Sequence, residues 1–152
     1  MAASVNTLRQ TLTEIIRDLT AYGVKGTLVG GLAVSIRAEP RFTRDADIVI
    51  SVEDDAAAER LIYHLQGCGY RILAVLERTL NGRLSTVRLT PPEGRGGRNV
   101  IDLLFASCGI EKEISEDAEE IEIFSGLSLP VARSGHLLAM KLLAHDVFNL
   151  SV

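Results

Sequence analysis

Apolar side chains recur every three or four residues near the start of the chain, which is the spacing of one face of an α-helix. Val5, Leu8, Leu12 and Leu19 follow this spacing, so residues 4–22 are predicted to form an amphipathic helix that stops at Gly23. Four further helices are expected, over residues 31–38, 54–66, 109–118 and 133–146.

Shorter apolar or alternating runs between these helices predict strands. They cover residues 25–29, 46–51, 71–78, 83–90, 99–105 and 120–124. Asn81-Gly82 is a strong hairpin signal between two of them, and the alternation of acidic and apolar residues in Glu120–Phe124 is typical of an edge strand. The order of elements predicts an α/β (α+β) fold, a mixed sheet with helices packed mainly on one face. With no internal repeat or linker, residues 1–152 are expected to form one domain.

Bulk composition narrows the class of protein only slightly. No apolar run reaches the length of a membrane span, and the N-terminus lacks the layout of a signal peptide, so a cytoplasmic location without membrane association is expected. Cys68 and Cys108 are too few and too far apart for a disulfide framework or a zinc site. His64, His136 and His145 form no metal-binding pattern and are expected to be structural or surface residues.

Charge is unevenly distributed, although the net charge of −4 argues against a general nucleic-acid-binding protein. Residues 71–98 contain six arginines and two glutamates, whereas residues 111–122 are strongly acidic. The arginine-rich stretch could hold a polyanionic substrate. The other interpretation is that both stretches are solvated faces of strands and loops.

A glycine pair and two aspartates are the strongest chemical signal in the chain. Gly30-Gly31 follows a short apolar run, and Asp45 and Asp47 open another apolar run after thirteen intervening residues. Glycine lets backbone amides approach a phosphate closely. Asp45 and Asp47 lie two residues apart, so in a strand both side chains point to one face. Together they predict a site for Mg²⁺ carrying a nucleoside triphosphate.

Asp102 is a third candidate carboxylate, because it interrupts an otherwise apolar strand where a carboxylate is costly unless it is paired or bound to metal. If its strand neighbours that of Asp45 and Asp47, three carboxylates converge. The alternatives are an ion pair between Asp102 and a nearby arginine, and a solvated strand start in which Asp45 and Asp47 pair with Arg41 or Arg44.

These motifs resemble the DNA polymerase β-like nucleotidyltransferase superfamily, and within it the AbiEii/AbiGii-type nucleotidyltransferases, many of which are toxins of toxin–antitoxin systems. The matching segments are Leu28-Val29-Gly30-Gly31-Leu32-Ala33-Val34, Arg41-Phe42-Thr43-Arg44-Asp45-Ala46-Asp47, residues 121–132 and residues 137–144. The resemblance covers residues 25–145 approximately.

The resemblance implies a role for each matching residue. Asp45 and Asp47 would bind two Mg²⁺ ions, and Asp102 would share a metal and activate the acceptor hydroxyl. Gly30 and Gly31 would hold the triphosphate through backbone amides alone, because Gly31 stands where many relatives have serine. Arg44 would belong to the nucleotide-binding residues. Lys141 would contact phosphate, or would be a solvated helix lysine.

Two functions follow from this resemblance. The first is a metal-dependent transfer of a nucleoside monophosphate from a nucleoside triphosphate to a hydroxyl of an RNA 3′ end, a protein or a small molecule. The second is a non-catalytic nucleotide-binding or interaction subunit with the same fold. The chain departs from fuller relatives after Ala144, so a partner such as an antitoxin or a homodimer mate is expected. Phe148, Leu150 and Val152 are expected to form part of its contact surface.

Overall fold

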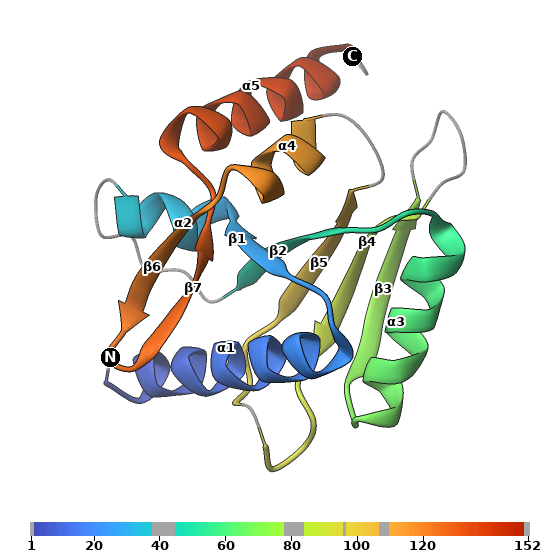
Figure 1. Cartoon of the computed structure of the whole chain (residues 1–152), viewed down its shortest axis with the longest axis vertical. Helices are drawn as coiled ribbons and strands as arrows, with labels where there is room; N and C mark the ends of the chain where they lie inside the picture. The colour runs from blue at the N-terminus through green and yellow to red at the C-terminus, as the bar shows by residue number, and fades with distance from the viewer. Residues whose placement is uncertain (1, 38–44, 78–83, 96, 107–109, 151–152) are drawn as a thin grey trace.

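The computed structural model of this protein describes residues 2–37, 45–77, 84–95, 97–106 and 110–150 (Figure 1). The helices are α1 (Ala2–Tyr22), α2 (Gly30–Arg37), α3 (Asp55–Gly67), α4 (Ile110–Glu116) and α5 (Ser134–Leu150). The strands are β1 (Gly26–Val29), β2 (Ala46–Ser51), β3 (Arg71–Glu77), β4 (Leu84–Thr90), β5 (Ile101–Ala106), β6 (Glu119–Phe124) and β7 (Leu127–Val131).

The seven strands form one sheet in the order β3-β4-β5-β2-β1-β7-β6. Strands β2 and β5 are parallel, as are β1 and β7, and every other neighbouring pair is antiparallel. The mixed sheet and the α/β fold that the sequence predicts are therefore confirmed. Strand β6 lies at one edge of this sheet, which agrees with the alternating pattern of its sequence.

Most predicted elements lie within a few residues of the observed ones, and one strand was not predicted. β7 contains Pro130, and proline usually argues against a strand because it cannot donate a ladder hydrogen bond. β7 nevertheless pairs with β6 on one side and β1 on the other. The hairpin turn predicted at Asn81-Gly82 lies outside the described residues, although β3 and β4 do pair antiparallel.

The helices divide between the two faces of the sheet, which corrects the expectation that they pack mainly on one. The first face carries fully buried apolar side chains such as Leu28, Ile48 and Leu103. Helix α1 packs there, since a Cβ built on Gly26 would lie 2.7 Å from Ile48 Cγ2 and 3.1 Å from Leu19 Cδ1. Helix α3 continues this layer beside β3 (Figure 1).

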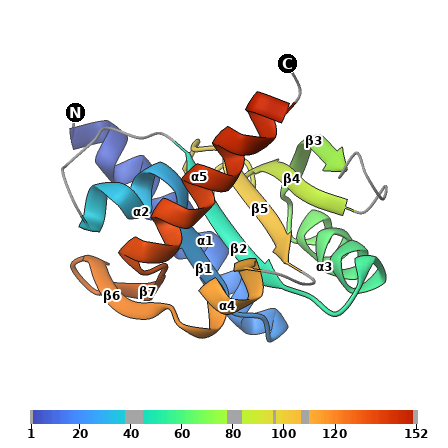
Figure 2. The same cartoon turned by 90° about the horizontal axis from the view of Figure 1, so that it is seen from above.

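The second face is covered by α2, α4 and α5, which lie together above β1 and β2 (Figure 2). Thr27 Oγ1 donates a 3.4 Å hydrogen bond to Ser115 Oγ, which joins this face of β1 to α4. Two-sided burial explains why consecutive apolar residues occur in β1 and β2. Over β4 and β5 the same face is more open, and the Arg88 side chain there is 51% exposed.

Two sequence-based expectations concern features outside this description. The side chains of residues 143–150 and all of Val152 lie outside it, so the apolar surface expected from Phe148, Leu150 and Val152 remains a prediction. Among the described helices, none is long and apolar enough to cross a membrane.

Candidate functional site

Asp47 and Asp102 lie directly opposite each other in the parallel strands β2 and β5. Paired residues of neighbouring strands point to the same face, so the register places both carboxylates on the more open face of the sheet. Asp45 precedes β2 by one residue and is close enough to act electrostatically on Asp47. The structure therefore places Asp47 and Asp102 side by side, with Asp45 near enough to affect the charge of Asp47.

Gly30 lies directly against the Asp47 side chain. Strand β1 runs antiparallel to β2, and its last residue, Val29, pairs with Asp47. Gly30 follows with φ of 72° and begins α2. A Cβ at Gly30 would lie 2.8 Å from Asp47 Cγ, so any other residue would collide with this carboxylate. Gly31, the next residue of α2, is exposed to solvent.

The electrostatics of Asp47 reflect crowding of like charges. The pKa of Asp47 is raised from 3.8 to about 6, chiefly by burial and then by the negative charges of Asp102 and Asp45. When Asp47 is protonated, its hydroxyl can donate a hydrogen bond to Asp102, which favours the neutral form further. The positive charge of Arg88 lowers this pKa and only partly offsets the other effects. Asp47 is thus a carboxylate whose charge is poorly compensated by the protein.

Arg88 forms an ion pair with Asp102 through two parallel hydrogen bonds. Arg88 lies opposite Asp102 in the antiparallel pairing of β4 and β5. Its Nε donates to Asp102 Oδ1 at 2.8 Å, and its Nη2 donates to Asp102 Oδ2 at 3.0 Å. The pair raises the pKa of Arg88 above its usual value. The ion-pair alternative for Asp102 is therefore what this structure contains.

No individual signal in the sequence distinguishes Arg88 from the other five arginines of residues 71–98. It becomes recognisable only through the register, because β4 must pair with β5 at the position of Asp102. The hairpin signal predicted that β3 and β4 would pair, but no local pattern predicts which residue of β4 faces Asp102.

Arg44 and Lys141 are the other predicted nucleotide-binding residues. Arg44 lies outside the described residues, as does Arg41, so their pairing with Asp45 or Asp47 stays a prediction. Lys141 lies in α5, on the side of the sheet that carries the aspartates, and its side chain is exposed.

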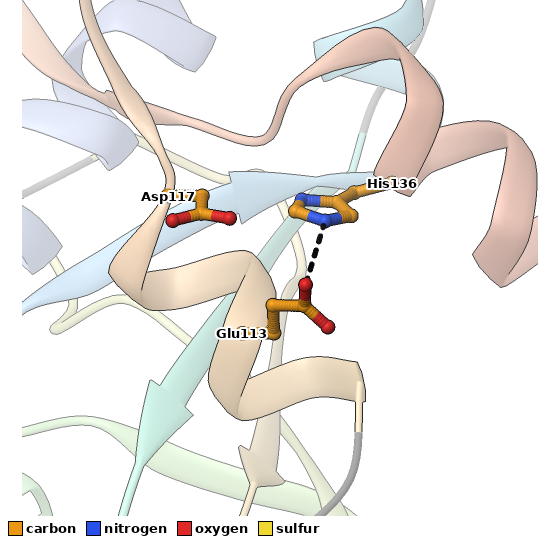
Figure 3. A group of neighbouring side chains, drawn as sticks. All are labelled: Glu113, Asp117 and His136. Carbon is orange, nitrogen blue, oxygen red and sulfur yellow. Dashed lines mark ion pairs between the residues drawn. The ribbon is translucent and has the colours of Figure 1, made fainter.

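Glu113, Asp117 and His136 form a second group of metal-ligand side chains that the sequence did not suggest (Figure 3). One ligand atom from each lies within 4.8 Å of the others, and His136 Nε2 is 4.0 Å from Glu113 Oε1. His136 Nδ1 is buried and has no hydrogen-bond partner among the residues that the structure describes. The group lies between α4 and the start of α5, and only folding brings His136 to the two acids, which are four residues apart in the chain.

A scan of known protein families finds none that matches the sequence, and no curated protein sequence is significantly similar to it. Solved structures do match. A proposed nucleotidyltransferase from Thermotoga maritima, TM1012, superposes with a TM-score of 0.62 and 14% identity over 92% of this chain and 86% of its own. An antigenic nucleotidyltransferase-like protein from Paracoccidioides brasiliensis superposes with a TM-score of 0.58 and 14% identity, over 91% of this chain and 66% of its own.

A third match is MenT4, a nucleotidyltransferase toxin from Mycobacterium tuberculosis, with a TM-score of 0.48 and 19% identity over 91% of this chain and 57% of that chain. A superposition at that level is too loose to add to the first two. The two closer superpositions cover nearly the whole of this chain, so its fold is that of nucleotidyltransferases.

Proposed function

From a nucleotidyltransferase fold that carries three neighbouring carboxylates, we propose that the protein binds a nucleoside triphosphate with divalent metal and transfers its nucleoside monophosphate to a hydroxyl, releasing pyrophosphate. The main support for this proposal is the pairing of Asp47 with Asp102 across β2 and β5, beside Gly30. Carboxylates that share one face are the ligands that Mg²⁺ uses in such sites.

The residues present fit a divalent cation. Asp47 has a pKa of about 6 because its side chain is partly buried and because the negative charges of Asp102 and Asp45 lie nearby. A cation bound between these groups would compensate that charge and favour the ionised form of Asp47. Asp45, Asp47 and Asp102 would hold Mg²⁺, with two ions expected. The ions would neutralise charge on the reacting phosphate.

The chain's own groups would complete the site. The amides at the start of α2, at Gly30 and Gly31, lie beside Asp47, and a helix N-terminus favours bound phosphate. Gly31 is exposed, so phosphate can reach its amide. Asp102 would accept the proton of the acceptor hydroxyl when Arg88 no longer occupies both of its oxygens. Arg44 and Lys141 would add positive charge next to the phosphates.

Arg88 is the feature that favours the second candidate function, a nucleotide-binding or interaction subunit without activity. Its two hydrogen bonds to Asp102 already satisfy this carboxylate without metal. In a toxin–antitoxin system, an antitoxin or a second copy of the chain could then be the relevant partner. The two functions differ in whether metal releases Asp102 from Arg88.

Nucleotide turnover tests the proposal. The protein would be incubated with Mg²⁺ or Mn²⁺, each α-labelled nucleoside triphosphate in turn, and an RNA pool as acceptor. We expect label on the acceptor and release of pyrophosphate, both lost in Asp47→Asn and Asp102→Asn. Glu113→Gln, at the second group of acids, should retain the activity and serves as the matched control.

Binding supplies a second measurement that does not require the right acceptor. Mg²⁺ and nucleoside triphosphate together should raise the melting temperature, since ligands of the native state stabilise it. The variant with Asp45→Ala and Asp47→Ala should remain folded and lose this shift. An unchanged shift in that variant would place the nucleotide elsewhere and refute the proposed site.

A further inference from the structure

A cleft of about 910 Å³ lies between α1 and the ends of β3 and β4, and its lining does not include Asp45, Asp47 or Asp102. Its walls are the N-terminal half of α1, the start of β3, the end of β4, and the segment that leads from β4 towards β5. The charged residues in its lining are Arg9, Arg71, Arg95, Arg98, Glu14 and Glu93. Four arginines against two glutamates make this a positive region in a protein of net charge −4.

The four arginines have different partners. Arg95 is held by the protein, because its Nη2 donates to the Cys68 carbonyl at 2.9 Å and its Nη1 lies 3.3 Å from Glu14 Oε2. Arg9 donates to the Ser125 carbonyl. Arg71 and Arg98 are exposed, and neither side chain has a hydrogen bond or ion pair within the described part of the chain. These two guanidinium groups are therefore available to an external anion.

The strand register places the cleft close to the carboxylate site. Arg71 pairs with Thr90, which lies two residues beyond Arg88 on the same strand, and Arg88 pairs with Asp102. Arg98 precedes Asp102 by four residues, so their Cα atoms are at most about 14 Å apart. An extended polymer that occupies the cleft can therefore also reach the carboxylate site.

We propose that this cleft binds the phosphate backbone of a single-stranded nucleic acid, which is the acceptor whose terminal hydroxyl reaches Asp102. This inference rests on the proposed function and names its acceptor class. Guanidinium groups bind phosphate through paired hydrogen bonds, and successive phosphates suit positive groups spaced along a cleft. An acidic peptide, the other polyanion of this kind, has no regular charge spacing and no terminal hydroxyl to present.

Fluorescence anisotropy with labelled RNA and DNA oligonucleotides of twelve nucleotides, without metal or nucleotide, tests the cleft directly. The double variant Arg71→Gln with Arg98→Gln should bind at least about tenfold more weakly in low salt. Two lost phosphate contacts should also reduce the slope of log K against log salt by about 1.4. Arg60→Gln with Lys112→Gln removes the same charge from exposed positions on α3 and α4 and should leave both values nearly unchanged.

This experiment tests the proposal for the cleft and the proposal for the carboxylate site independently. Asp47→Asn should bind the oligonucleotides as well as the natural protein does, and the arginine double variant should keep its melting-temperature shift with Mg²⁺ and nucleoside triphosphate. Absence of salt-dependent binding to both oligonucleotides, or equal weakening by the arginine variant and its charge-matched control, would overturn the proposal. Binding without turnover would support the cleft and count against the proposed function alone.

Discussion

The carboxylates of Asp47 and Asp102 face each other from adjacent parallel strands, and Arg88 neutralises only one of them through direct hydrogen bonds. This difference in charge compensation between the two acids has measurable consequences for stability and for metal binding. Asp102 has a fixed partner, whereas the pKa of Asp47 rises to about 6.

The pKa of Asp47 predicts how stability depends on pH. Between pH 4 and 6 the folded protein holds a proton at Asp47 that the unfolded chain releases, so the free energy of unfolding should fall as pH rises through this range. Because the side chain is partly solvated, we expect a loss of about 1–2 kcal/mol. Asp47→Asn should be more stable than the natural protein at pH 8 and similar at pH 4, as measured by urea unfolding. Equal stability at pH 8 would contradict the raised pKa.

The same proton competes with metal. Mn²⁺ binding, followed by the melting temperature or by calorimetry, should weaken as pH falls below about 6, because a ligand carboxylate must be deprotonated. The decrease should approach about tenfold per pH unit if one proton is displaced. Glu113→Gln should show the same pH profile. A profile that is flat from pH 7 to 5 would indicate that the metal binds away from Asp47.

Gly30→Ala should damage the site through a steric collision. The new Cβ would lie 2.8 Å from Asp47 Cγ, at a residue whose φ is 72°. Backbone strain and collision together should cost about 2–4 kcal/mol. Gly126→Ala isolates the strain, because φ is 80° there and nothing lies within 4 Å of the built Cβ. Urea unfolding should show Gly30→Ala to be clearly the less stable of the two; equal losses would mean that Asp47 moves aside freely.

Arg88→Gln should show whether Arg88 competes with metal for Asp102 or assists metal binding there. Without Arg88, two neighbouring carboxylates lose their counter-charge, so the melting temperature without metal should fall. The additional rise caused by Mn²⁺ should become larger, since the metal no longer competes with a guanidinium group for Asp102. Arg60→Gln, on the exposed side of α3, should change neither value. A smaller rise with Mn²⁺ in Arg88→Gln would show that Arg88 assists metal binding.

Local patterns in the sequence predicted most elements because the signals are short-range. Helix α1 has a clear apolar face, and β1 and β2 are apolar runs bounded by glycine or aspartate. Which helix covers which face of the sheet was not predicted, because both faces of the central strands are buried and an apolar run does not show which side a given helix covers. β7 was missed, and Pro130 within it is a residue that argues against a strand.

The candidate site was likewise predicted where local patterns sufficed and missed where distant segments meet. Asp45, Asp47 and Asp102 could be selected as costly or paired acids, and their proximity followed once β2 and β5 were assumed to be neighbours. The Arg88–Asp102 ion pair, the grouping of His136 with Glu113, and the cleft beside α1 depend on pairing or packing between distant segments. Such relationships leave no local trace in the sequence.

The pairing of β2 with β5 also affects how the chain reaches its folded state. Asp47 and Asp102 are about 55 residues apart in the sequence, so closing this parallel pair costs more chain entropy than closing the β3–β4 hairpin. Parallel pairing across such a separation forms slowly relative to hairpins and helices. Helices α1 and α3 and the hairpin can therefore form before the two carboxylates meet. In a refolding experiment, recovery of metal binding should lag behind recovery of helical circular dichroism, and would report the last long-range pairing of the sheet.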